Sequence, residues 1–176
     1  MWFSLQSLSR WPLVLVSLWA ATACSPTYNW RSVQLEGLGV SALWPCKPTR
    51  AERPVPLEGQ TLQLKMLSCD AGGHTFAWGA MQLPAGVDRS TLAQGWQQAS
   101  LSSLKAKAEQ ARVWRPAIRG DLKASGWQAS GVRHDGEAIT AHAVVLHVRN
   151  ELHQLVIYGQ PSAALVNTWV EGIEAK

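Results

Sequence analysis

The stretch that decides the fold is WQASGVRHDGEAITAHAVVLHVRNELHQLVIY, residues 127–158. Its Asp135-Gly136 pair separates two segments with strand character, and Asp-Gly is among the strongest short signals for a β-hairpin. The two-residue type I′ turn that this pair favours fixes the register of the flanking strands. We therefore predict that Trp127 lies opposite Val144.

A second turn near residues 150–151 predicts a third antiparallel strand. This turn would place Leu155 opposite Leu146. The same register pairs Ile157 with Val144. Since side chains alternate between the two sides of a strand, the apolar residues would form one continuous face across three strands: Trp127, Val144, Leu146, Leu155 and Ile157.

Upstream, alternating apolar and polar residues predict further strands. Residues 61–69, TLQLKMLSC, alternate cleanly, and the AGGH turn leads into residues 75–83, TFAWGAMQL, which complete a hairpin. Residues 31–45, RSVQLEGLGVSALWP, should contain a first strand that ends near Pro45, because proline cannot donate to a central ladder. The proline-rich residues 53–59, RPVPLEG, should form at most a short edge strand.

Two segments have helical periodicity. In residues 90–111, STLAQGWQQASLSSLKAKAEQA, apolar residues recur at helical spacings. Either Asp88, just before this segment, or Ser90, its first residue, can cap the helix. Residues 161–173, PSAALVNTWVEGI, predict a second helix with one buried stripe. Together the elements predict an α+β domain: an antiparallel β-sheet of about five to seven strands with two helices packed against it, in the order β-β-β-α-β-β-β-α.

Three segments and the order of the elements resemble a known scaffold. The segments are LGVSALWPCKP (38–48), LQLKMLSC (62–69) and HTFAWGAMQLP (74–84). They look like the PsbP-like fold, which some bacterial envelope lipoproteins of the DcrB type also use. The similarity extends over residues 33–173. It implies a binding or accessory scaffold without a shared catalytic motif, so it assigns no catalytic residue.

The first 23 residues have the parts of a secretory signal. Arg10 is their only charged residue, an apolar run occupies residues 11–23, and the small residues 21–23 end that run. A transmembrane helix needs about 20 apolar residues, so this run is too short to span a membrane. We therefore predict a cleaved signal peptide at residues 1–23.

Cys24 decides how the chain is processed. Together with residues 21–23, Ala-Thr-Ala, it resembles the bacterial lipobox, in which the cysteine becomes the first mature residue and is acylated. Ser25 then implies sorting to the outer membrane. The alternative is cleavage by the general signal peptidase, which would leave Cys24 as an ordinary thiol. We predict a lipidated N-terminus and tether at residues 24–33 and a single α+β domain at residues 34–176.

Two further cysteines, Cys46 and Cys69, remain as a pair if Cys24 is lipidated. In an oxidising periplasm they predict a disulfide. Closing the loop between them would stabilise the fold by about 3.5 kcal/mol on the chain-entropy model. The alternative is a reactive thiol at Cys69 that His74 assists.

The charge of the mature chain is mild. Without Arg10 it has 15 Lys and Arg against 12 Asp and Glu, a formal charge of +3, which argues against a nucleic-acid partner. Trp114 stands between Arg112 and Arg115, and Trp and Arg are the side chains most enriched at interface hot spots. This segment is a candidate partner surface. Alternatively, Trp114 completes the core and the arginines are merely solvated.

The chain lacks the common motifs of catalytic and cofactor sites. It has no glycine-rich phosphate loop, no His-Glu-x-x-His helix and no nucleophile elbow. His142 and His147 are an odd number of residues apart, so they point to opposite faces of a strand, and with His153 they predict no metal site. We therefore predict no catalytic residue, no metal and no cofactor.

These observations favour a non-enzymatic binding or accessory factor for an envelope protein. The lipid anchor would hold it at the periplasmic face of the outer membrane of a Gram-negative bacterium. Two alternatives stay open. One is an enzyme that acts on an envelope substrate through His142 or Cys69, and the other is a structural subunit of an envelope assembly.

Overall fold

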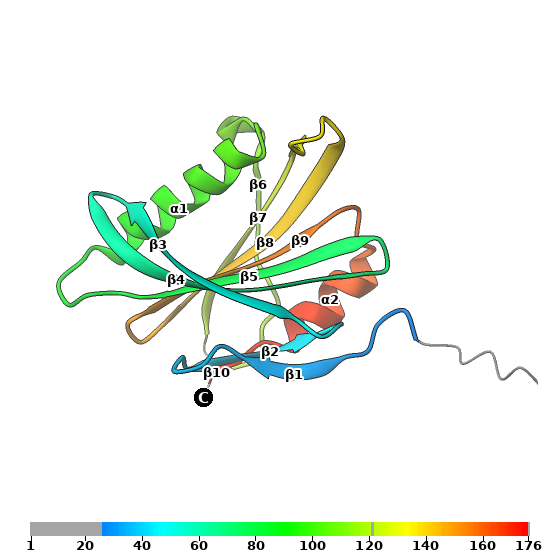
Figure 1. Ribbon diagram of the computed structural model, residues 1–176, viewed down its shortest axis with the longest axis horizontal. Coiled ribbons are helices and arrows are strands. Elements are labelled where there is room, and N and C mark those ends of the chain that lie inside the picture. The colour runs from blue at the N-terminus through cyan, green and yellow to red at the C-terminus, as the bar shows by residue number, and fades with distance from the viewer. Residues whose placement is uncertain (1–25, 121, 176) are drawn as a thin grey trace, which may run out of the picture.

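The computed structural model describes residues 26–120 and 122–175 (Figure 1). The predictions for the signal peptide (1–23) and for Cys24 concern residues outside this part of the chain. The described residues form ten strands, two α-helices and one 3₁₀-helix. In chain order these are β1 (Arg31–Gln34), β2 (Val40–Trp44), β3 (Thr49–Leu57), β4 (Gln60–Ala71), β5 (His74–Gln82), α1 (Arg89–Ser103), η1 (Ala108–Gln110), β6 (Arg112–Trp114), β7 (Lys123–Val132), β8 (Ala138–Val148), β9 (Glu151–Tyr158), α2 (Ala163–Glu171) and β10 (Glu174–Ala175).

Within the described chain the strands form two antiparallel sheets. The small sheet has the order β1-β2-β10, and the large sheet has the order β3-β4-β5-β9-β8-β7-β6. Figure 1 shows the small sheet and α2 on one side of the large sheet and α1 on the other. The fold is therefore rich in β-structure, and the predicted class, a balanced α+β domain with one sheet, is wrong.

The predicted fold class was wrong because several strands lack a clear alternation of apolar and polar residues in the sequence. Residues 31–45 contain two strands and not one, since a turn at Gly37 (φ 76°) folds them into a hairpin. β3 extends over nine residues although it contains Pro54 and Pro56, which an edge strand tolerates. β6 and β10 have three and two residues, which is too short for a periodic pattern.

The Asp135-Gly136 hairpin forms, but with a loop of a different length. Gly136 has φ 89°, whereas Asp135 is not in the left-handed region, and the Gly136 N–H donates to the Arg133 carbonyl (3.0 Å). This geometry corresponds to a type I turn followed by a glycine bulge, with three loop residues instead of two. The register consequently shifts by one residue, so Trp127 pairs with Ala143. Such a shift puts Trp127 on the other face of the sheet from the predicted one.

The turn between β8 and β9 also differs from the prediction. Leu155 pairs with Val144 and not with Leu146. The register is therefore displaced by two residues, and an even displacement keeps every side chain on its face. The apolar residues of these two strands share one buried face as predicted: Val144, Leu146, Leu155 and Ile157.

The two faces of the large sheet are covered differently. We call the side that packs against the small sheet and α2 the closed face, and the side that packs against α1 the groove face. Four large aromatic side chains in the closed-face core are at most 1% exposed: Trp44, Phe76, Trp78 and Trp169. The Trp44 ring lies 6.3 Å from the Phe76 ring and 6.1 Å from the Trp78 ring, as measured between centroids.

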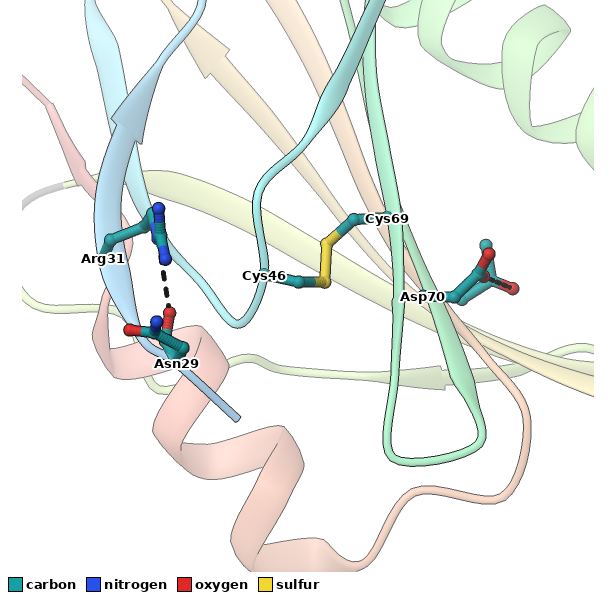
Figure 2. Close-up of a disulfide and its surroundings, with 6 residues drawn as sticks. Asn29, Arg31, Cys46, Cys69 and Asp70 are labelled. Atoms are coloured by element: carbon teal, nitrogen blue, oxygen red, sulfur yellow. Dashed lines mark hydrogen bonds between the residues drawn. A yellow bond between two sulfur atoms is a disulfide. The ribbon is translucent and has the colours of Figure 1, made fainter. Parts of the chain in front are cut away.

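A disulfide joins Cys46 to Cys69 and confirms the predicted pair (Figure 2). Cys46 follows β2 of the small sheet and Cys69 lies in β4 of the large sheet, with their Cα atoms 6.1 Å apart. The bond therefore fastens the two sheets to each other. Because Cys69 is disulfide-bonded, it has no free thiol for the reactive site that was the alternative.

The folded domain includes residues that were predicted as a tether. β1 begins at Arg31, and both Tyr28 and Trp30 pack against the closed-face core. The Trp30 ring contacts the Phe76 ring edge-on at 6.4 Å between centroids. The Tyr28 hydroxyl lies 3.3 Å from Nδ1 of His74, so this histidine has a structural partner.

α1 begins as predicted but ends early. The Asp88 carboxylate accepts a hydrogen bond from the Ser90 N–H (2.9 Å) and caps the helix. The helix ends at Ser103 and not near residue 111, and Lys105 just beyond it adopts a φ of 51°. Neither α-helix of the described chain has the length and hydropathy that a membrane crossing requires.

Candidate ligand-binding groove

A groove with a volume of about 850 Å³ lies on the groove face, between α1 and the strands β3, β4, β5 and β9. Its floor includes Met66 of β4, Ala77 and Gly79 of β5, and Val156 of β9. α1 contributes Trp96 to the lining, and the loop between β7 and β8 also borders the groove. The volume is within the range of roughly 300–1,000 Å³ that is typical of small-molecule sites.

The groove exists because α1 covers the groove face only in part. Leu92 and Leu101, near the two ends of the helix, are its fully buried residues. Between them the Trp96 ring lies on Gly79, where an added Cβ would be only 2.7 Å from Cζ2 of the ring. The floor at this ring is lined by Gly79, which has no side chain, and by Ala77, whose side chain is a single methyl group. Small residues in β5 thus make room for both the tryptophan and the groove.

One buried amide on the groove floor has an unused acceptor. Gln154 is 5% exposed, and its Nε2 donates to Ser100 Oγ (2.8 Å). The Ser100 hydroxyl donates its one proton to the Trp96 carbonyl (2.9 Å), so it must accept from Gln154, which fixes the orientation of the amide. Gln154 Oε1 is buried and accepts no hydrogen bond from the described residues. Since a buried polar atom without a partner is costly, Oε1 is a candidate contact for a donor group on a ligand.

The charged residues that border the groove are all basic. The lining includes Arg53, Arg133 and His134 but no Asp or Glu. Neither arginine lies within 4.0 Å of a carboxylate of the described chain. Tyr158 also lines the groove, and burial raises the pKa of its phenol, so this group stays neutral. The groove therefore offers apolar surface, one free acceptor and positive charge.

A second buried polar cluster lies on the closed face. Trp78 Nε1 donates to His153 Nδ1 (3.3 Å), and His153 Nε2 lies 2.9 Å from Glu151 Oε2. An indole N–H can only donate, so Nδ1 accepts and the histidine proton is on Nε2, directed at Glu151. Burial lowers the pKa of His153, which therefore forms this bond as a neutral ring. Glu151 also accepts from the Gly39 N–H (2.8 Å), so the cluster connects the large sheet to the β1–β2 hairpin and has a structural role.

The predicted partner surface consists of a packed and an exposed part. Trp114 ends β6, and its ring covers Gly126 of β7 and packs against the closed-face core. Its Nε1 atom is buried. Arg112 and Arg115 are exposed. The position of Trp114 fits the alternative in which it completes the core, and a partner surface at the two arginines stays a prediction.

The other candidate residues do not come together. His142 and His147 lie on opposite faces of β8, as their spacing predicts, and His153 pairs with Leu146. Among residues 26–120 and 122–175, no three His, Cys, Asp or Glu side chains form a group that could hold a metal. Two strands, β5 and β9, separate His142 from Cys69. The two residues named for an enzyme therefore share no site.

Comparisons of the chain with protein-family models, with curated proteins and with solved structures give no match. The resemblances to the PsbP-like fold and to bacterial lipoproteins therefore stay predictions from the sequence.

The groove was not predicted from the sequence, although two signals point toward it. Gln154 directly precedes the apolar residues 155–157 in β9 and is buried like them, and a buried amide requires partners. Gly79 lies in the middle of β5, where a glycine often marks the close approach of another group. Neither residue reveals by itself that the other lies beside it.

Proposed function

We propose that this chain is a lipid-anchored, non-enzymatic binding protein of the bacterial envelope and that the groove holds its ligand, a small amphipathic molecule. The observation that supports this function is the groove itself, with its apolar floor and the unpaired acceptor of Gln154. Ligand sites typically combine apolar walls with a few polar groups that fix the orientation of the ligand.

The disulfide supports the envelope as the location. Structural disulfides persist in oxidising compartments such as the periplasm and are rare in the cytosol of most bacteria. The Cys46–Cys69 bond joins the two sheets, so the domain would be less stable in a reducing compartment.

Dye binding tests the function of the groove. The neutral dye N-phenyl-1-naphthylamine, which fluoresces in apolar sites, should bind the purified protein with one saturable site. Ala77→Trp and Met66→Trp fill the floor and should each weaken binding by about tenfold or more, because they remove the apolar volume. Ala117→Trp is the matched control at an exposed position outside the lining, and it should bind as wild type does. Absence of dye binding to folded wild-type protein would contradict the proposal.

Membrane fractionation tests the anchor. In this proposal the thiol of Cys24 is acylated, so Cys24→Ser should release the protein from the membrane of a Gram-negative cell into the soluble fraction. Several acyl chains are needed for stable attachment, so the wild-type protein should resist a high-salt wash. A Cys24→Ser variant that stays with the membrane after that wash would refute the anchor and leave the groove experiment unaffected.

A further inference from the structure

We infer that the groove selects a single-chain anionic amphiphile: an acyl chain with a carboxylate or phosphate headgroup and a hydroxyl or N–H group along the chain. This inference rests on the proposed function, because it names the class of ligand that the same groove would hold. Three features of the groove lead to it, namely its charge, its free acceptor and the course of its floor.

The charge of the lining selects an anion and indicates where its headgroup lies. Arg133 and His134 are adjacent and exposed at the loop between β7 and β8, whereas β3 contributes one charged residue to the lining, Arg53. Exposed acidic residues outside the lining stand near both positions, Glu52 beside Arg53 and Asp135 with Glu137 beside Arg133, so what distinguishes the loop is its pair of adjacent basic lining residues. The headgroup therefore belongs at Arg133, whose guanidinium can bind a carboxylate or a phosphate with two parallel hydrogen bonds.

The position of Arg133 is supported by the backbone around it. The Val132 N–H donates to the Leu104 carbonyl at the end of α1 (2.8 Å), and the Arg133 N–H donates to the Glu137 carbonyl (2.8 Å). The first bond holds the hairpin against α1, and the second closes the loop. The backbone that presents the guanidinium is therefore held at the border of the groove.

The free acceptor of Gln154 selects a ligand with a donor group. A plain alkyl chain on the floor would leave Oε1 unpaired. Oε1 is shielded from solvent in the described structure, so a hydroxyl or N–H on the chain would supply the missing hydrogen bond once the side chains around Oε1 shift to admit it. Sites with a polar group that the ligand must satisfy discriminate strongly against analogues that lack the matching group. We therefore expect a hydroxylated chain to bind more tightly than the plain chain.

The floor runs across the strands and suits a narrow chain. Val156 pairs with Ala77, Ala77 with Ser68, and Ser68 with Thr49, so one row of floor residues crosses β9, β5, β4 and β3 beside the Trp96 ring. Three strand spacings of about 4.8 Å make this row roughly 14 Å long. Apart from Val156 this row has only small side chains, so it leaves room for a narrow ligand. An extended alkyl chain fits such a course.

Competition against N-phenyl-1-naphthylamine tests the charge selection. Dodecanoate and dodecyl phosphate, each below its micelle concentration, should displace the dye at concentrations about tenfold lower than dodecyltrimethylammonium, because the headgroup pairs with Arg133. The better of the two anions identifies the headgroup. Arg133→Gln should abolish the preference for anions, and the matched variant Arg115→Gln, with the same change of charge at an exposed position outside the lining, should retain it. Equal displacement by the anionic and cationic chains, while the dye still binds, would overturn this inference and leave the proposed function standing.

A series of hydroxylated chains tests the role of Gln154. Octadecanoate is compared with its 3-, 9- and 12-hydroxy derivatives, and at least one of them should bind about tenfold more tightly, since it satisfies a buried acceptor. Gln154→Met keeps the length of the side chain and removes the acceptor, so it should abolish this preference while the dye still binds. If all three hydroxylated chains bind wild type no better than octadecanoate does, the donor part of the inference is wrong.

Discussion

The closed face and the groove face belong to the same strands but are packed in opposite ways. On the closed face Trp78 is 1% exposed and Leu155 is fully buried, under the small sheet and α2. On the groove face Met66, Ala77 and Trp96 stay partly exposed, because one helix covers a sheet that is seven strands wide. The groove face also contains a buried cluster under α1, with Leu64, Met81 and Leu152, so only the part of this face that α1 leaves open is available for a ligand.

The remaining stabilising bonds also gather on the closed face. The disulfide joins the small sheet to β4, and Glu151 with His153 joins β9 to the β1–β2 hairpin. Among the described residues, α1 is joined to the groove face by single hydrogen bonds, such as those from Gln154 to Ser100 and from the Val132 N–H to the Leu104 carbonyl at the helix end. Changes in the groove should therefore alter binding more than stability, and changes on the closed face should do the reverse.

Leu67→Gln should produce the largest effect. Leu67 is 1% exposed in the closed-face core, and the change removes its apolar burial and buries an amide without a partner. The two effects together should lower the free energy of unfolding by about 3–5 kcal/mol. Urea unfolding measures this loss. A loss below about 1 kcal/mol would mean that the closed face is not the rigid core described above.

Removal of the disulfide should rank next. The double variant Cys46→Ser/Cys69→Ser should lower the free energy of unfolding by about 3.5 kcal/mol, because the reduced chain has a longer free loop when unfolded. Urea unfolding with and without a reductant provides the control. The reductant should destabilise wild type and leave the double variant unchanged, and the opposite pattern would refute a stabilising bond.

The pH dependence of stability should be a smaller effect, and His153 contributes to it. Burial lowers the pKa of this histidine below its ordinary value of 6.5. Below pH 6.5 the unfolded chain binds a proton that the folded chain does not, so the free energy of unfolding falls as the pH decreases toward the folded pKa. Burial also lowers the pKa values of His142 and His147, so they contribute in the same direction.

His153→Gln isolates the contribution of this one residue. The amide does not titrate, and its oxygen can still accept from Trp78 Nε1. Urea unfolding at a series of pH values from 7.5 to 5 should therefore give a shallower loss of stability for the variant than for wild type. Identical slopes would show that His153 binds protons equally in the folded and unfolded states, so that burial does not lower its pKa.

Local patterns predicted the hairpins well where the turn has one dominant geometry. Gly72 and Gly73 both have positive φ, as the AGGH segment suggests, and β4 and β5 pair accordingly. Asp135-Gly136 fits either a two-residue or a three-residue loop, and only the conformation of Asp135 decides between them. The difference between a two-residue and a three-residue loop moves Trp127 to the opposite face of the sheet. The pattern of apolar residues does not distinguish the two loop lengths.

The disulfide was predictable from the number of cysteines, but the groove was not predictable from any one segment. Its floor joins Ala51, Met66, Gly79 and Gln154, which come from four strands that are far apart in the sequence. Their proximity depends on the register of three strand pairs and on the path of α1 above them. The free acceptor of Gln154 appears only when Ser100 is placed beside it.

Met66→Gln should have the smallest effect on stability and gives the sharpest test of the comparison. Met66 and Leu67 are neighbours in β4, point to opposite faces, and receive the same new side chain in the first and last predictions. Met66 is only partly buried at the groove, so a glutamine there can reach water, and the free energy of unfolding should fall by no more than about 1 kcal/mol. The affinity for N-phenyl-1-naphthylamine should nevertheless fall several-fold, since an amide replaces apolar floor. If Met66→Gln cost as much stability as Leu67→Gln, the groove face would be packed as tightly as the closed face, and no groove could exist there.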